Sequence, residues 1–159
     1  MKKLLPIIIM ALVFASCKKG NNATPDPNAD NPTKIVGKWK DGVGLSVYYT
    51  NGKEVYRETF AAPTTITGYY EFTSTGAFNL YSVSGSTSTL LGSLSYSLTN
   101  SNTVLHLSSG SNSSDDPISF TDNNTLIITS TTIGGVTYTS NGTTYNADKE
   151  IDTSTLIRL

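Results

Sequence analysis

Hydrophobic and polar residues alternate with a period of two over most of the chain from residue 35 to residue 159. The clearest alternating runs are residues 43–50, 66–72, 90–98, 105–107 and 118–120. Successive side chains of a strand point to opposite faces, so such a run has one buried face and one face that is rich in hydroxyl groups. The same region has no eleven-residue window with the i, i+3, i+4, i+7 spacing of an amphipathic helix. The pattern therefore predicts strands.

Turn-forming residues separate these runs and set their order. They are Asn51-Gly52, Thr75-Gly76, Ser84-Gly85, Thr99-Asn100, Ser109-Gly110, Asp122-Asn123-Asn124, Gly134-Gly135 and Asn141-Gly142. Many of them lie some ten to fifteen residues apart, and short links between strands make sequential neighbours antiparallel. Open edges rich in Thr and Val would invite aggregation, which favours closure. We therefore expect an all-β fold, an up-and-down antiparallel meander barrel of about eight to ten strands.

The beginning of the chain has the pattern of a secretion signal. Lys2 and Lys3 precede an apolar run from Leu4 to Phe14, which is well short of the length that a membrane span requires. Small residues follow, and then Cys17, the single cysteine of the chain. We assign residues 1–16 to a signal peptide.

The segment that ends at the cysteine is Phe14-Ala15-Ser16-Cys17, and it resembles the lipobox of bacterial lipoproteins. The resemblance implies cleavage before Cys17, acylation of this cysteine and anchoring in membrane lipid. Because Lys18 rather than aspartate follows, it implies the outer membrane of the cell envelope. Residues 17–34 are rich in Pro and Asn and poor in large apolar side chains, and we expect a flexible tether. Residues 35–159 are left as one domain.

The domain resembles the lipocalin-like domains of small bacterial lipoproteins. It opens with Gly37-Lys38-Trp39, and three later segments, residues 70–78, 96–107 and 118–128, resemble the hairpins of these domains. The resemblance implies a barrel in which Trp39 plugs the closed end. It also implies that Arg158, on the last strand, lies across the Trp39 ring, with Gly37 and Trp39 as structural residues. An added early hairpin (residues 42–60) and a long segment (residues 133–149) depart from the family pattern.

Candidate catalytic chemistry is scarce in this sequence. The chain has one histidine, His106, and one cysteine, so we expect no zinc site. It has no Gly-x-Ser-x-Gly elbow and no phosphate-binding glycine loop. No Lys or Arg lies between Glu58 and Asp148, which argues against a nucleic-acid partner. We expect no enzymatic activity, no catalytic residues, no metal and no cofactor.

The leading hypothesis is a barrel that binds a small apolar or amphipathic ligand. The candidate lining residues alternate along three strands: Leu45, Val47, Tyr49, Tyr70, Phe72, Leu94 and Tyr96. An eight-strand barrel can also be filled by its own side chains. The alternative is a surface interaction or glycan-binding β-sandwich that uses the adjacent tyrosines Tyr48-Tyr49 and Tyr69-Tyr70. A hydrolase or isomerase built around His106 is a third hypothesis.

Overall fold

A computed structural model describes residues 28–159 of the protein. The predicted signal peptide and Cys17 lie outside the described residues. The elements are one short helix, α1 (Asn31–Ile35), and nine strands: β1 (Gly37–Thr50), β2 (Lys53–Phe60), β3 (Gly68–Phe72), β4 (Ala77–Ser84), β5 (Thr87–Thr99), β6 (Val104–Ser109), β7 (Asn112–Asp122), β8 (Thr125–Ser140) and β9 (Thr143–Arg158). No helix among the described residues is long and apolar enough to cross a membrane.

The strands form one closed antiparallel barrel. The sheet order is β2-β1-β3-β4-β5-β6-β7-β8-β9, and β9 pairs again with β1, which closes the sheet on itself. Eight strands, β1 and β3 to β9, make up the barrel, and β2 is an additional strand on β1. The predicted meander barrel is therefore confirmed, and the β-sandwich alternative is wrong because all strands belong to a single closed sheet.

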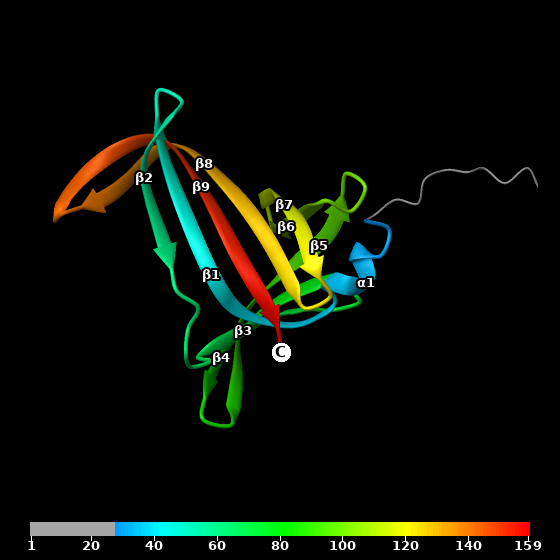
Figure 1. The fold of residues 1–159 in the computed structure, drawn as a ribbon. Coiled ribbons are helices and arrows are strands. Elements are labelled where there is room, and N and C mark those ends of the chain that lie inside the picture. Colours follow the sequence, from blue (N-terminus) through cyan, green and yellow to red (C-terminus); the bar gives the residue numbers. More distant parts are fainter. Residues whose placement is uncertain (1–27) are drawn as a thin grey trace, which may run out of the picture.

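The barrel opens into an arm on one side. The first residues of β1 pair with β3, whereas residues from Gly44 to Thr50 pair with β2 instead. Strands β8 and β9 pair with each other over almost their whole length, up to Ser140 and Thr143. Figure 1 shows β1, β8 and β9 rising together from the barrel, with the β8–β9 hairpin curving over at its far end. The arm corresponds to the early hairpin and the long late segment that the sequence indicated.

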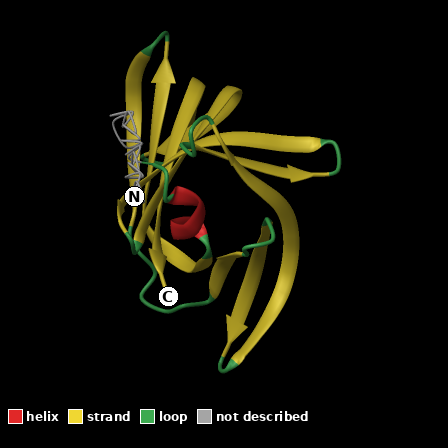
Figure 2. Ribbon diagram, turned by 90° about the vertical axis from the view of Figure 1, so that its right-hand side faces the viewer, coloured by secondary structure: helices red, strands yellow, loops and turns green. Residues whose placement is uncertain are grey.

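The hydrophobic core fills the opposite, closed end of the barrel. Its most buried side chains come from α1 and from strands all around the barrel: Ile35, Trp39, Phe72, Leu105, Ile118, Leu126 and Leu156. Figure 2 shows α1 framed by the strands, where it covers this end. Each such side chain contributes about 1.5 to 3 kcal/mol by its burial. The closed end is therefore packed with the protein's own side chains.

A bulge in β1 reverses the face to which its later side chains point. Asp41 pairs with Leu156 of β9, and Gly44 pairs with Ser154, so β1 has one residue more than β9 between these pairs. Before the bulge, odd-numbered residues such as Trp39 point to the interior. After the bulge, even-numbered residues point to the interior instead. The prediction that Leu45, Val47 and Tyr49 line the barrel is wrong for this reason: they lie on the outer face.

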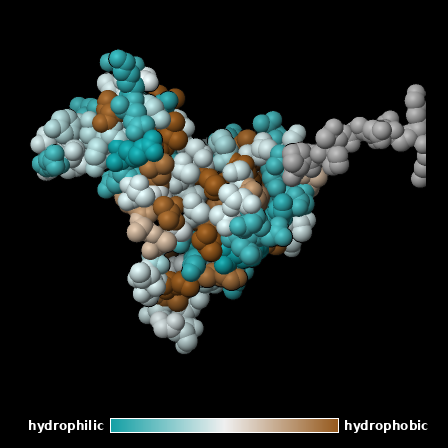
Figure 3. Space-filling view, viewed as in Figure 1, coloured by the Kyte–Doolittle hydropathy of each residue, from teal (hydrophilic) through white to brown (hydrophobic). Residues whose placement is uncertain are grey.

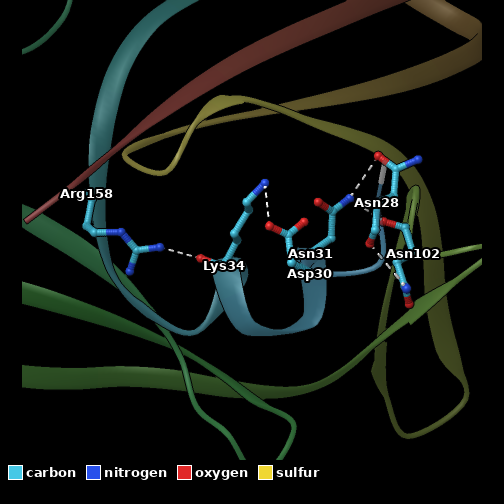
Figure 4. Close-up of polar contacts among 6 residues, drawn as sticks. All are labelled: Asn28, Asp30, Asn31, Lys34, Asn102 and Arg158. Carbon is cyan, nitrogen blue, oxygen red and sulfur yellow. Dashed lines mark hydrogen bonds and ion pairs between the residues drawn. The ribbon is translucent and has the colours of Figure 1, made fainter. Parts of the chain in front are cut away.

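The ordered domain begins earlier than residue 35. Asn31 is buried and donates a hydrogen bond to the Asn102 carbonyl oxygen at 2.9 Å, and Lys34 pairs with Asp30 at 2.9 Å (Figure 4). Pro32 lies in the first turn of α1, where proline is well tolerated because the first backbone N–H groups have no partner within the helix. The expected tether therefore extends too far: its last residues form α1 and pack on the barrel.

Arg158 fastens the closed end, as the resemblance implied. Its guanidinium carbon lies 4.3 Å from the centre of the Trp39 ring. The guanidinium also donates hydrogen bonds to the carbonyl oxygens of Lys34, Val36 and Asn123 (Figure 4 shows the bond to Lys34). Gly37 is required beside it, because a side chain at that position would collide with the guanidinium and the backbone there has φ +140°. The predicted contact between Arg158 and Trp39 is confirmed.

Replacing Arg158 should weaken this end of the barrel. Arg158→Ala removes three charge-assisted hydrogen bonds and the contact with the Trp39 ring, so we expect the free energy of unfolding to fall by about 2 to 3 kcal/mol. Urea denaturation followed by Trp39 fluorescence measures it. Arg57→Ala is the matched control, because Arg57 forms an exposed ion pair with Glu54 and its loss should cost less than about 1 kcal/mol. Equal losses in both variants would contradict the role of Arg158.

Candidate ligand-binding site in the open half of the barrel

The register of the sheet defines which residues face the interior. Directly paired residues of antiparallel strands present their side chains on the same face. Leu126 pairs with Leu156, and both are buried in the closed-end core. Counting from this pair toward the open end of the barrel, every second residue of β8 and of β9 therefore faces the interior, until a bulge interrupts the strand.

One interior wall of the open half is apolar. Phe78 pairs with Leu94, and Leu80 pairs with Gly92, between β4 and β5. Leu94 and Leu107 line a cavity of about 190 Å³ together with serines and an asparagine of β6 and β7. Leu80 is 38% exposed although it lies on the interior face. Apolar surface therefore remains uncovered here, beyond the packed core.

The interior face of β1, β9 and β8 is polar beyond the core, and it continues onto the additional strand β2 in three rows of paired residues. The first row is Phe60, Gly44, Ser154 and Ile128; the second is Glu58, Ser46, Asp152 and Ser130; the third is Tyr56, Tyr48, Glu150 and Thr132. We call these twelve residues the acidic face. Serine, threonine and tyrosine hydroxyls surround its three carboxylates. The open half therefore presents apolar side chains on one side and hydrogen-bonding groups on the other.

Hydroxyl groups accompany the interior carboxylates. Ser46 donates a hydrogen bond to Asp152. Burial, followed by the Glu150 carboxylate that accepts a hydrogen bond from its hydroxyl, raises the pKa of Tyr48 to about 12. Burial and then the nearby Asp41 carboxylate raise the pKa of Tyr70 to about 12 as well. Both tyrosines therefore remain neutral hydrogen-bond donors at neutral pH.

The bent tip of the β8–β9 hairpin covers the far end of the acidic face. Gly134 and Gly135 both have positive φ, which non-glycine residues rarely adopt, and a register shift occurs at this point. Beyond the shift, Val136 and Ala147 pack against Tyr48 in a second hydrophobic cluster. The Tyr138 ring stacks on Tyr56 with 4.8 Å between ring centres. The tip thus bounds the third row and leaves the first two rows facing the barrel.

The predicted lining residues divide into two groups. Tyr70, Phe72 and Tyr96 lie in or against the packed core, and Leu94 reaches the open cavity. The other three, Leu45, Val47 and Tyr49, lie on the outer face, where Val47 pairs with Arg57 and Tyr49 lies under Lys149.

Sequence reasoning missed Tyr48, Glu150 and Asp152 as interior residues, and Glu58 of β2 on the same face of the sheet. Their alternation along β1, β2 and β9 is visible in the sequence, but the bulge that turns them inward is not. A glycine at position 42 was the available signal, because a side chain there would collide with the Thr155 carbonyl oxygen.

A groove also exists at the closed end, between α1 and β5. It has a volume of about 520 Å³ and is lined by α1, the β3–β4 turn and β5: Pro32, Thr33, Val36, Ser74, Gly76, Tyr96, Leu98 and Asn102. Its polar groups are engaged at least in part, because the Tyr96 hydroxyl donates a hydrogen bond to the Thr73 carbonyl oxygen at 2.8 Å. The groove lacks a charged side chain among its lining residues.

The single histidine lies on the outer face of the barrel. His106 Nδ1 is 2.7 Å from the Asp115 carboxylate, and Ser97 pairs with His106 on the neighbouring strand. A Ser–His–Asp row thus crosses three strands, yet no hydrogen bond joins Ser97 to His106 among the described residues. Within residues 28–159, no three His, Cys, Asp or Glu side chains gather in a way that could hold a metal ion.

Comparison with known proteins adds no family to this description: no family model matches the sequence, and no curated protein is found to be similar to it.

The interior tyrosines predict a loss of stability at alkaline pH. Tyrosines of the unfolded chain lose their protons near pH 10, whereas Tyr48 and Tyr70 keep theirs to about 12 in the folded state. The folded state binds more protons in this interval, so the free energy of unfolding should fall as the pH rises from 10 to 12. Urea midpoints at pH 8, 10 and 11.5 measure the fall. A double variant, Tyr48→Phe with Tyr70→Phe, should show a smaller fall, and an equal fall would contradict the assignment.

Proposed function

We propose that this protein is a lipid-anchored lipoprotein of the bacterial cell envelope whose barrel binds a small amphipathic ligand and catalyses no reaction. The observation that carries the proposal is the division of the barrel interior. The closed end is filled by Trp39, Phe72 and their neighbours, whereas the open half keeps uncovered apolar surface opposite a polar wall. A ligand with one apolar and one polar part matches both walls.

The apolar part of the ligand would lie against β4, β5 and β6. Leu94 and Leu107 offer the cavity, and Leu80 extends the apolar surface toward the open end. The polar part would face the hydroxyls and carboxylates of β1 and β9, such as Ser46 and Asp152. Neither wall requires a catalytic group for this role.

Lipid attachment at Cys17 would orient the barrel. The described chain begins at the closed end, where Asn28 accepts hydrogen bonds from Asn31 and Asn102. Ten residues lie between Cys17 and Asn28, and the eleven steps from one Cα atom to the next reach at most about 38 Å. The closed end would therefore face the membrane, and the open half would face away from it. In Figure 3, hydrophobic side chains on the visible face form separate patches on the upper arm, across the centre and on the lower projection, which favours attachment through lipid over insertion of a surface.

Ligand binding is tested by placing a charge on the apolar wall. The neutral fluorophore N-phenyl-1-naphthylamine should bind the wild-type protein, and Leu94→Asp or Leu107→Asp should weaken this binding at least about tenfold, because the cavity that they line becomes charged. Leu91→Asp is the matched control, since Leu91 is 62% exposed and should tolerate a carboxylate. Absence of fluorophore binding by the wild-type protein, or equal binding by all variants, would contradict the proposed site.

Lipid attachment is tested separately in cells. Cys17→Ser should abolish incorporation of labelled palmitate and move the protein from the detergent phase to the aqueous phase in Triton X-114 partitioning, because the acyl chains provide its membrane affinity. Lys18→Ala keeps the cysteine and should still be labelled. Labelling of the Cys17→Ser protein would show that the anchor is not at this residue.

A further inference from the structure

We propose that the ligand of the barrel carries a positively charged ammonium group, which binds at the first two rows of the acidic face. This inference rests on the proposed function, because it names the polar group of the ligand that the open half would hold.

The three rows of the acidic face carry charges of one sign, and Lys53, which pairs with Thr50, lies beyond the third row on this side of the sheet. The acidic face carries Glu58, Glu150 and Asp152, and none of its twelve residues is Lys or Arg. On the opposite face, Arg57 pairs with Val47, and Lys149 pairs with Tyr49. The basic side chains at these paired positions thus point away from the interior, which gives the interior a negative potential.

The interior carboxylates have neutral partners. Asp152 accepts a hydrogen bond from Ser46, and Glu150 accepts one from Tyr48. The ion pairs among residues 28–159 are Lys34–Asp30, Arg57–Glu54 and His106–Asp115, and none includes a carboxylate of the acidic face. A hydroxyl stabilises a carboxylate but leaves its negative charge in place. These charges therefore remain available to a cation.

A cavity of about 300 Å³ adjoins the first row. Phe60, Gly44 and Ser154 of that row line it, together with Asp41 and apolar residues that include Ala61 and Pro63. The Phe60 ring is 48% exposed, so it can contact a ligand. An aromatic face close to a carboxylate is the combination that binds alkylated ammonium groups, because the ring attracts the cation and its methyl groups pack on the ring.

The arrangement discriminates among amphipathic ligands by charge. An anionic head would meet the carboxylates of Asp41, Glu58 and Asp152 with no Lys or Arg among the twelve residues of the acidic face. A neutral head, such as a sugar, could accept and donate hydrogen bonds but would gain nothing from the negative potential. An ammonium head gains from both the carboxylates and the ring of Phe60.

The experiment compares two probes that share a decyl chain and differ in the head group. Decyltrimethylammonium and decyl maltoside are titrated calorimetrically below their micelle-forming concentrations against the wild-type protein and variants. The wild-type protein should bind the ammonium probe at least about tenfold more tightly than the maltoside, and this preference should decrease with added NaCl. Glu58→Gln with Asp152→Asn should reduce the preference to about one, and the dependence of ammonium binding on NaCl should become weaker.

The controls separate this inference from the proposed function. Glu71→Gln removes one carboxylate from the outer face, where Glu71 pairs with Lys38, and should keep the preference. Glu58→Gln alone, at an exposed position, should lower the preference without loss of folding, as monitored by Trp39 fluorescence. Equal binding of both probes by the wild-type protein would overturn the ammonium inference and leave ligand binding standing. Binding of neither probe would overturn both.

Discussion

The pairing of the last strand with the first is the constraint on which the rest of the structure depends. This pairing turns a meander of hairpins into a barrel, and Arg158 fixes it at the end where both termini of the domain meet. The guanidinium contacts the Trp39 ring of β1, the end of α1 and the turn between β7 and β8. This one side chain of β9 therefore joins its own strand to three other segments. Trp39 adds a hydrogen bond from its indole nitrogen to the Ile35 carbonyl oxygen at 2.8 Å, which holds α1 over the core. With this end closed and packed, the opposite end is free to open.

The consequence of this division is a barrel with two different interiors. Near Trp39 the interior is a hydrophobic core of buried side chains that include Phe72, Leu126 and Leu156. Farther along β1, β8 and β9 the same face changes from Leu126 and Leu156 to serine, aspartate and glutamate within a few residues. Small polar residues do not fill the space that leucines fill, so the change in chemistry is also a change in packing. The same change from leucine to polar residues along β8 and β9 therefore produces both the polar wall and the open volume.

The sequence predicts the fold well because its signals are local. Alternation identifies the strands, and Asn51-Gly52 and Asn141-Gly142 lie at the tight turns, with positive φ at all four residues. The contact between Trp39 and Arg158 followed from a resemblance rather than from the pattern itself. The orientation of β1 after Gly42 did not follow, because a single inserted residue reverses the face without changing the alternation. The sequence likewise predicts a tether for residues 31–34, because their place on the barrel depends on the distant Asn102 and Arg158.

The bulge in β1 explains both the wrong prediction for Leu45, Val47 and Tyr49 and the polar character of the candidate site. Without the extra residue, Leu45, Val47 and Tyr49 would continue the apolar interior from Trp39, and the barrel would be packed farther toward its open end. With it, Ser46 and Tyr48 face Asp152 and Glu150 instead, and the apolar residues move to the outer face. There Val47 is buried between its neighbours Arg57 on β2 and Ile151 on β9. A single bulge thus allows one strand to serve a hydrophobic core at its beginning and a polar, negatively charged wall at its end.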